Sequence, residues 1–235
     1  MKIGLLSDAH GNDRGLRLCI DFLNRQKVDR FFFLGDAVGY FPEPNKTMKL
    51  LNEVEAVCLL GNHDAMLLGS LACTPERDEV CQIRLSREAL SEAYRRQLAE
   101  RAPTWVMELE GKKILMAHGS PDDPLKGYVY PDSDLTPFAD QPFAAVFMGH
   151  THRPFISNQS GVIVLNAGSC GLPRDQGDLA SCALYDTESG AADIFRVPME
   201  VGRLIDQYRG RLHQSVLSCL MRKSKATVFG KVTGQ

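Results

Sequence analysis

Histidines and acidic residues are concentrated at the ends of predicted β-strands, and this pattern is the strongest constraint on the fold. Five of the 6 histidines lie in short, glycine-flanked segments that directly follow strand-like runs. These segments are Asp8-Ala9-His10-Gly11, Gly61-Asn62-His63-Asp64, His118-Gly119 and Gly149-His150-Thr151-His152, and a further strand ends at Gly35-Asp36. Because ligands of open α/β sheets bind beyond the carboxyl ends of the strands, we expect these ends to meet at one site.

The first third of the chain predicts repeated β-α units. Residues 2–7 form an apolar run that ends in a polar turn, and apolar residues at helical spacing follow from Leu16 to Leu23. Residues 30–34 are apolar without alternation, which is typical of a strand covered on both faces. The three phenylalanines within that strand therefore predict core packing rather than a ligand-stacking stripe. Residues 54–60 predict a third strand.

The rest of the chain changes character twice. Residues 65–102 contain helix-start signals and an apolar stripe in a Glu/Arg-rich sequence, and they predict a helical insertion. From residue 103 to about 196 the pattern predicts mostly strands and turns. A last amphipathic helix is predicted at about 199–222. We therefore expect one α/β domain that spans residues 1–235.

Composition excludes several classes of protein. The 27 basic and 29 acidic residues give a formal net charge of -2, which argues against a broad basic face for nucleic acid. The apolar runs are much shorter than the roughly 18 residues of a membrane span, and Asp8 comes too early for a secretory signal peptide. The 7 cysteines form no C-x-x-C pair, which favours reduced thiols. We expect a cytoplasmic protein without a membrane partner.

The donor types in the polar segments predict a transition-metal site. D-x-H at a strand end aims two donors at one cation, and H-x-H in an extended turn places both imidazoles on one side. Oxygen and imidazole donors without a nearby thiolate favour Mn²⁺, Fe, Zn²⁺, Co²⁺ or Ni²⁺. Any one of these histidines alone is equally well explained by packing, but the combination favours a metal site whose spacing suits a pair of ions.

The same segments, in the same order, resemble those of the calcineurin-like metallophosphoesterase superfamily over residues 3 to about 196. The runs at residues 35–40, 118–121 and 166–175 resemble a small bacterial and archaeal branch, the YfcE-like phosphodiesterases and diadenosine-tetraphosphatase-like proteins. Ala167 and Cys170 depart from that branch, in which a proline and an aliphatic residue are common.

The resemblance implies a four-layer αββα sandwich, with two mixed sheets flanked by helices and a dinuclear site at one edge. It assigns one divalent transition-metal ion to Asp8, His10, Asp36 and His152, and a second ion to Asp36, Asn62, His118 and His150. Asp36 would bridge the two ions. A carboxylate suits that position because it offers an anionic oxygen to each of two cations.

The resemblance also implies a metal-dependent phosphoesterase. It would hydrolyse a phosphodiester, phosphoanhydride or phosphomonoester by attack of a metal-bound hydroxide. His63, which the family pattern leaves out of the ligand set, is then free to contact the phosphate and to protonate the leaving oxygen. Asp64 would orient that imidazole, or it would be a turn or helix-cap residue.

Two further residues are candidates for contact with the phosphate. Arg174 lies in a Gly-rich loop after a strand, where it would clamp phosphate oxygens or else pair with Asp175 or Asp178. Asn12 follows the D-x-H motif closely enough to reach a bound phosphate, or it starts a helix as the N-cap.

The alternatives concern what the site acts on. A protein serine/threonine phosphatase of the same superfamily ranks lower, because those enzymes carry Gly-Asn-His-Glu where this chain has Gly-Asn-His-Asp. A non-catalytic scaffold like the retromer subunit is disfavoured by the complete ligand set, and a DNA-end nuclease by length and charge. We expect a small phosphoester or nucleotide substrate, read by residues 65–102 and 119–141, and a homo-oligomer is left open.

Overall fold

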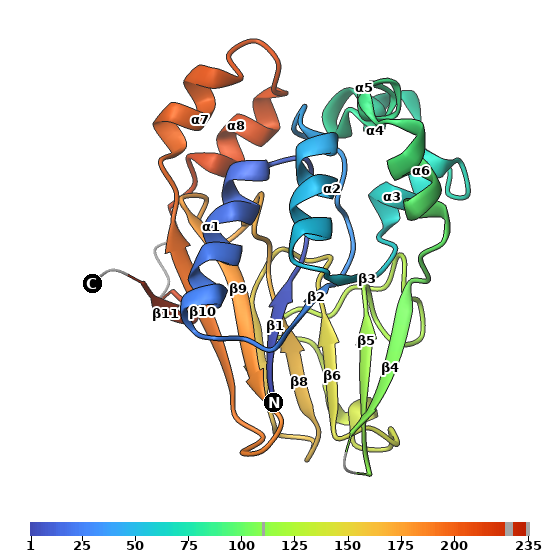
Figure 1. Cartoon of the computed structure of the whole chain (residues 1–235), viewed down its shortest axis with the longest axis vertical. Helices are drawn as coiled ribbons and strands as arrows, with labels where there is room; N and C mark the ends of the chain where they lie inside the picture. Colours follow the sequence, from blue (N-terminus) through green and yellow to red (C-terminus); the bar gives the residue numbers. More distant parts are fainter. Residues whose placement is uncertain (110, 224–227, 234–235) are drawn as a thin grey trace.

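The computed structural model describes residues 1–109, 111–223 and 228–233 and contains two stacked mixed sheets (Figure 1). The six-stranded sheet has the order β11 (Lys231–Val232), β10 (Ala192–Pro198), β9 (Leu179–Asp186), β1 (Lys2–Leu6), β2 (Arg30–Phe33) and β3 (Val57–Cys58). The five-stranded sheet has the order β4 (Thr104–Leu109), β5 (Lys112–Ala117), β6 (Ala145–Met148), β8 (Ile163–Asn166) and β7 (Phe155–Ser157). Three neighbouring strands run parallel in each sheet: β1, β2 and β3 at one edge of the six-stranded sheet, and β5, β6 and β8 at the centre of the five-stranded sheet.

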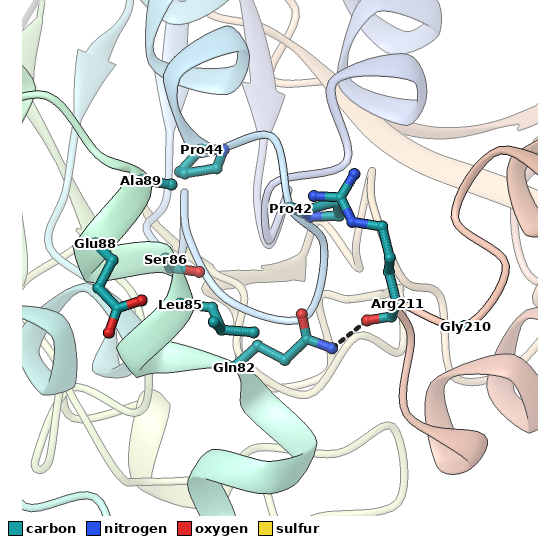
Figure 2. Close-up of a pocket in the computed structure, with 9 residues that line it drawn as sticks. All are labelled: Pro42, Pro44, Gln82, Leu85, Ser86, Glu88, Ala89, Gly210 and Arg211. Carbon is teal, nitrogen blue, oxygen red and sulfur yellow. Dashed lines mark hydrogen bonds between the residues drawn. The ribbon is translucent and has the colours of Figure 1, made fainter.

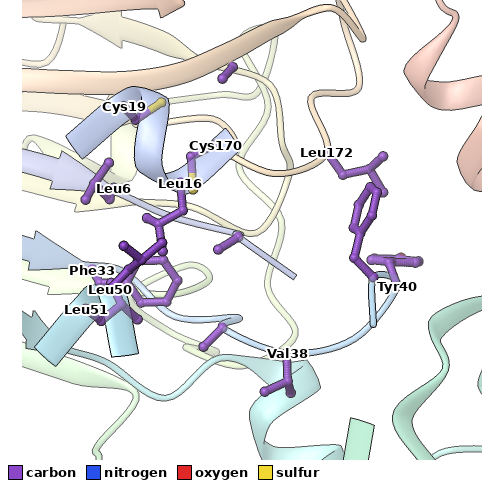
Figure 3. Packing of buried hydrophobic residues seen from close by; sticks show 14 of the residues in the cluster. Leu6, Leu16, Cys19, Phe33, Val38, Tyr40, Leu50, Leu51, Cys170 and Leu172 are labelled. Carbon is purple, nitrogen blue, oxygen red and sulfur yellow. The ribbon is translucent and has the colours of Figure 1, made fainter. Parts of the chain in front are cut away.

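Helices pack on the outer face of the six-stranded sheet and above its upper edge (Figure 1). They are α1 (Asp13–Arg25), α2 (Pro44–Glu53), α3 (Asn62–Leu68), α4 (Pro75–Cys81), α5 (Ile83–Ala89), α6 (Glu92–Ala99), α7 (Val201–Gln207) and α8 (Gln214–Leu220). Leu16 of α1 and Leu50 and Leu51 of α2 pack with Phe33 in the core under these helices (Figure 3). The described helices include none with the length and apolar character that a membrane crossing requires.

The alternation of side chains along the strands divides the core into layers. Phe32 points into the core between the two sheets, whereas Phe31 and Phe33 point into the core under the helices. Successive strand residues face opposite sides of a sheet, so one uninterrupted apolar run fills both layers. The prediction that these phenylalanines are core residues is confirmed.

The outer face of the five-stranded sheet is covered by the segment between β5 and β6. Val129, Leu135 and Phe138 from this segment pack on Val146 and Val164 of the sheet. Its helical part is the short 3₁₀ helix η1 (Thr136–Phe138). The expected sandwich of two mixed sheets flanked by helices is confirmed, and a loop with a single turn of 3₁₀ helix forms much of its fourth layer.

Three predicted elements differ in detail. The single helix predicted at about 199–222 is instead α7 and α8, because Gly210 adopts a left-handed conformation with φ 73° and His213 starts a new helix as its N-cap. The insertion at 65–102 contains the end of α3 and the three short helices α4, α5 and α6. The strand predicted at 54–60 pairs with β2 only at Val57 and Cys58, because α2 continues to Glu53.

Candidate metal centre

The loops after five strands carry the candidate ligands to one buried site. Asp8 and His10 follow β1, Asp36 follows β2, and Asn62 is the first residue of α3 after β3. His118 follows β5, and His150 and His152 follow β6 in the other sheet. Backbone contacts hold the loops together: Gly149 N–H donates to His118 C=O at 3.0 Å, and His150 N–H donates to Asp8 Oδ2 at 2.9 Å. The site therefore joins the upper edges of both sheets.

Several candidate ligands adopt a left-handed backbone conformation that is uncommon outside glycine. The φ angles of Asp8, His10, Asp36, His150 and His152 lie between 52° and 66°. Such strained positions persist where surrounding contacts hold them, and they cluster at functional sites. Gly61 allows the close approach of these loops, because a Cβ atom there would collide with the backbone nitrogen and carboxylate of Asp36.

Asp8, His10 and His152 form the first group of converging donors. The Nδ1 atoms of His10 and His152 lie 3.1 Å from the Val38 carbonyl and 2.6 Å from the Leu172 carbonyl, so each Nδ1 carries the donated hydrogen. The two Nε2 lone pairs consequently face each other at 3.0 Å, and His152 Nε2 lies 3.3 Å from Asp8 Oδ1. Lone pairs this close repel unless a cation or proton lies among them, so the group fits a metal ion.

Asp36, His118 and His150 form a second group. His118 Nδ1 donates to the Leu34 carbonyl at 2.8 Å, and its Nε2 lies 3.5 Å from Asp36 Oδ2 and 3.0 Å from Asn62 Oδ1. In this orientation the Asn62 oxygen faces only acceptors, as a metal ligand would. Rotating the amide by 180° would instead turn its oxygen to Arg77 at 3.2 Å. The seven residues predicted as ligands are thus brought together, and the donor set fits divalent metals.

Burial and mutual charge determine the protonation of these groups. Burial alone would raise the pKa of Asp8, but the adjacent His152 and His10 outweigh it and hold the pKa well below its ordinary value. Burial lowers the pKa of His150 to about 4. Burial also opposes protonation of His118, yet the Asp36 carboxylate dominates and raises its pKa to about 9. His118 therefore carries a proton at neutral pH, and metal binding through its Nε2 atom would release that proton.

His63 lies against the first group. Its backbone N–H donates to Asp36 Oδ1 at 2.7 Å, and its ring lies 4.5 Å from the ring of His10 and 4.9 Å from that of Tyr40. The ring nitrogen Nδ1 is buried and makes no hydrogen bond within the described part of the chain. Burial lowers the pKa of His63 well below its ordinary value, so the imidazole is neutral at pH 7. One His63 nitrogen also lies within 4.8 Å of donors of His10 and Asp36.

Asp64 does not orient the His63 imidazole. Its carboxylate instead accepts backbone N–H groups of Asp36, Ala37 and Gly61, each at 3.0 Å. An acidic residue in the first turn of α3 satisfies amides that the helix leaves free and ties the helix to the loop after β2. The helix-cap interpretation therefore holds, and the predicted orienting role is wrong.

Arg174 does not pair with Asp175 or Asp178, which was the alternative to a phosphate contact, because both acids bind other residues. Asp175 forms a two-point contact with the buried Arg196, and Asp178 binds Lys223 at 2.6 Å. Arg174 Nη2 donates to Tyr40 Oη at 3.2 Å, and its backbone N–H donates to the His152 carbonyl at 3.1 Å. The guanidinium is thereby placed beside the first ligand group.

Asn12 has a structural role. Its side-chain oxygen accepts the Gly15 N–H at 3.2 Å, and its amide nitrogen donates to the Gly171 carbonyl at 2.8 Å. The side chain is fully buried. Asn12 is the N-cap of α1 and links it to the 166–175 loop, so the predicted phosphate contact is not supported.

Two residues at the site were missed from the sequence. Tyr40 contacts His10 and His63 with its ring and accepts the Arg174 hydrogen bond. The sequence could have indicated Tyr40, because it lies only four residues after the predicted ligand Asp36, in the same loop. Arg77 reaches the Asn62 amide from α4 of the insertion, and no local pattern marks that contact.

A separate cavity of about 580 Å³ lies between α5, residues 42–44 and the turn that joins α7 to α8 (Figure 2). Gln82 spans one side of it and donates to the Arg211 carbonyl at 2.5 Å. None of the residues described as lining it is a candidate ligand. The chemistry of this protein is therefore expected at the buried Asp/His cluster rather than in this separate cavity.

Two stacked mixed sheets converge on a buried Asp/His cluster, and the donors of this cluster are of the types that could hold divalent cations. The chain belongs to the calcineurin-like phosphoesterase superfamily, whose domain model matches residues 1–190. The resemblance inferred from the sequence is thereby confirmed.

Several known proteins are similar over most of the chain. An uncharacterized protein of Methanocaldococcus jannaschii is 26% identical over 226 residues, covering 87% of this chain and 90% of its own length. A phosphodiesterase of the same organism is 25% identical over 170 residues, covering 72% of this chain and 84% of its own length.

Solved structures show the same fold. A metallophosphoesterase from Sphaerobacter thermophilus has a TM-score of 0.77 and 24% identity, and covers 94% of this chain and 98% of its own. A hypothetical protein from Pyrococcus horikoshii OT3 has a TM-score of 0.82 and 18% identity, and the match covers 93% of this chain and 97% of that protein. The phosphoesterase YfcE from E. coli has a TM-score of 0.51 and 20% identity, and the match covers 82% of this chain and 96% of that protein.

Proposed function

We propose that this protein is a metal-dependent phosphoesterase that hydrolyses a small phosphodiester, phosphoanhydride or phosphomonoester at a two-metal centre. The observation that carries the proposal is the convergence of three imidazole Nε2 atoms, on His10, His118 and His152, with the carboxylates of Asp8 and Asp36. Asp8, His10, Asp36 and His152 would hold one ion, and Asp36, Asn62, His118 and His150 the other. When bound, the ions would supply a hydroxide nucleophile at neutral pH and offset charge on the phosphoryl oxygens.

Three side chains beside the ligands have roles in this proposal. Arg174 would bind phosphate oxygens with the donors that Tyr40 leaves free, since a guanidinium pairs well with phosphate. Burial raises the pKa of Tyr40 above its ordinary value, so the phenol keeps its proton. His63 would donate its N–H to the phosphate or the leaving oxygen, and the negative charge of a bound phosphate would favour its protonation.

The similar proteins support a phosphoester substrate, and the formal net charge of -2 argues against a broad basic face for nucleic acid. The curated relative with a named activity is a phosphodiesterase, and YfcE is a phosphoesterase. All seven cysteines are free, which supports a reducing compartment, and we propose that the protein acts in the cytoplasm.

A hydrolysis panel tests the function. Metal-stripped protein would be restored in turn with Mn²⁺, Ni²⁺, Co²⁺, Zn²⁺ and Mg²⁺ and assayed on a diester, a monoester, 2′,3′- and 3′,5′-cyclic nucleotides and dinucleoside polyphosphates. We expect hydrolysis of at least one substrate that depends on added metal. Absence of hydrolysis with every ion, from protein that binds those ions, would favour the scaffold alternative.

The bridging ligand provides a matched test of the two-metal assignment. We expect Asp36→Asn to lose metal at both positions, because a neutral amide cannot compensate two cations. Asp140→Asn changes the same group at an exposed position and is the control. Elemental analysis that finds two tightly bound metals in Asp36→Asn would contradict the bridging role.

A further inference from the structure

Two tyrosines form the rim of the centre on the side of His150. The ring of Tyr128 lies 4.2 Å from the His150 ring at 30°, and the Tyr130 ring is stacked on Tyr128 at 5.7 Å and 4°. Tyr128 is 48% exposed and Tyr130 is 36% exposed. A column of aromatic rings thus runs from a candidate metal ligand to the solvent. Its exposed ring surface is flat and apolar, and it borders a polar site.

The surrounding loop fixes the direction of these rings. Val129, between the two tyrosines, is buried in the core on the outer face of the five-stranded sheet. Alternate residues of an extended segment point to opposite sides, so Tyr128 and Tyr130 share the other side. Ser120 N–H donates to the Gly127 carbonyl at 3.0 Å, and Tyr130 N–H donates to Ser133 Oγ at 2.8 Å. The rings are therefore positioned before any ligand arrives.

The charges around the centre differ between its two sides. Arg174 lies beside His152, where it is suited to phosphate. On the Tyr128 side a recess of about 150 Å³ is lined by polar and acidic residues such as Ser120, Asp122 and Asp134 and by apolar residues such as Pro137 and Phe138. None of the residues described as lining it is basic. A second phosphate is disfavoured there, whereas an uncharged ring with polar edges fits.

We infer that Tyr128 and Tyr130 stack against a flat aromatic group of the substrate, such as a nucleobase, while its phosphate lies at the metal centre. This inference rests on the proposed phosphoesterase function and adds a specificity site to it. Stacking of a base on an aromatic side chain contributes roughly 1–3 kcal/mol, which corresponds to about 5- to 150-fold in affinity.

Pairs of phosphate ligands that differ in one ring test this inference. Binding to the Mn²⁺-loaded protein would be measured by calorimetry for adenosine 5′-monophosphate against ribose 5-phosphate, and for phenyl phosphate against cyclohexyl phosphate. We expect the aromatic member to bind about 5- to 150-fold more tightly in at least one pair. Tighter binding of the aromatic member in both pairs indicates that stacking alone is sufficient. Tighter binding in the nucleotide pair only indicates that the recess also recognises the polar edges of the base.

Variants locate the preference on the tyrosines. Tyr130→Ala should reduce the ratio within each preferred pair toward one, and Tyr130→Phe should preserve it because the ring remains. Phe229→Ala removes an equally exposed ring at the edge of the other sheet and should leave the ratio unchanged. Tyr128→Ala should act like Tyr130→Ala, and its metal content is measured because Tyr128 contacts His150.

Equal affinities within both pairs would overturn the inference, as would a preference that survives both alanine variants. These outcomes are independent of turnover. Failure of the proposed function appears instead as absence of hydrolysis in the metal panel, so the two failures are distinguishable.

Discussion

At the scale of single residues, the backbone determines which nitrogen each histidine presents. Carbonyl groups of Val38, Leu34 and Leu172 each accept the Nδ1 hydrogen of one imidazole. The Nε2 atoms of those rings are thereby aimed inward without any ligand present. Contacts of this kind around metal ligands increase metal affinity, because the protein has already oriented its donors.

His63 provides the clearest test of a role in the reaction. A positioned acid typically contributes about 10²- to 10⁴-fold, and its importance grows with the basicity of the leaving group. We expect His63→Ala to lose much activity on a nucleoside or alkyl ester and less on a nitrophenyl ester. Comparison of kcat/KM for the two substrate types measures this difference.

Metal content must be measured in the same His63 variant, because a His63 nitrogen lies near donors of His10 and Asp36. Equal losses on both substrates would favour contact with the phosphate over proton donation. Loss of metal would show that His63 is a ligand, and the assignment of histidines to the two ions would then change.

Arg174 should act on phosphate and not on metal. Removal of a charged hydrogen-bond donor costs roughly 1.5–3 kcal/mol, so Arg174→Ala should weaken inorganic phosphate inhibition about 10- to 150-fold. Metal content should remain unchanged, because the guanidinium contacts Tyr40 rather than a ligand carboxylate. Arg209→Ala, which removes an exposed arginine paired with Asp206, is the control. Unaltered phosphate inhibition in Arg174→Ala would exclude this assignment.

At the scale of elements, the start of α3 joins the loops of two strands. Asp64 accepts three backbone N–H groups and is fully buried, so its carboxylate links α3 to the loop after β2. Loss of a charged acceptor leaves those buried donors unpaired. The arrangement of the second ligand group therefore depends on a residue that is not itself a predicted ligand and whose carboxylate binds backbone N–H groups rather than the His63 imidazole.

We expect Asp64→Ala to lower the free energy of unfolding by about 3 kcal/mol or more, since each unsatisfied buried donor costs roughly 1–3 kcal/mol. Urea denaturation of the metal-free protein measures this loss without a contribution from bound metal. Glu92→Ala removes the first-turn acid of α6, which is exposed, and should change stability by less than about 0.5 kcal/mol. An equal effect of the two substitutions would contradict the structural role of Asp64.

The sequence alone predicted those elements that a pattern of neighbouring residues determines. Apolar runs predicted β1 and β2, and glycine-flanked polar segments at strand ends predicted the ligand cluster. The division between α7 and α8 was missed, because an apolar stripe continues across Gly210 and only the left-handed turn interrupts it. Arg77 was missed because its contact with Asn62 depends on how the insertion folds back over the site, which no residue spacing records.

At the scale of the whole molecule, the candidate centre bridges the two sheets. Asp8 and Asp36 come from the six-stranded sheet, whereas His118, His150 and His152 come from the five-stranded sheet. Both groups of donors include residues of each sheet. Unfolding would separate these residues, so bound metal should stabilise the folded state of the whole chain.

Removal of metal should therefore lower the melting temperature. A ligand that binds only the folded protein stabilises it by about 2.7 kcal/mol at a free concentration of 100 times Kd. For a chain of 235 residues, each kcal/mol shifts Tm by roughly 2–4 °C, so chelation should lower Tm by about 5–10 °C. Differential scanning calorimetry with and without a chelator measures the shift, and restored metal should reverse it.

Asp36→Asn should show little response to either treatment, because the residue shared by the two predicted ions is lost. An identical Tm for the loaded and stripped wild-type protein would mean that the Asp/His cluster does not join the sheets through metal.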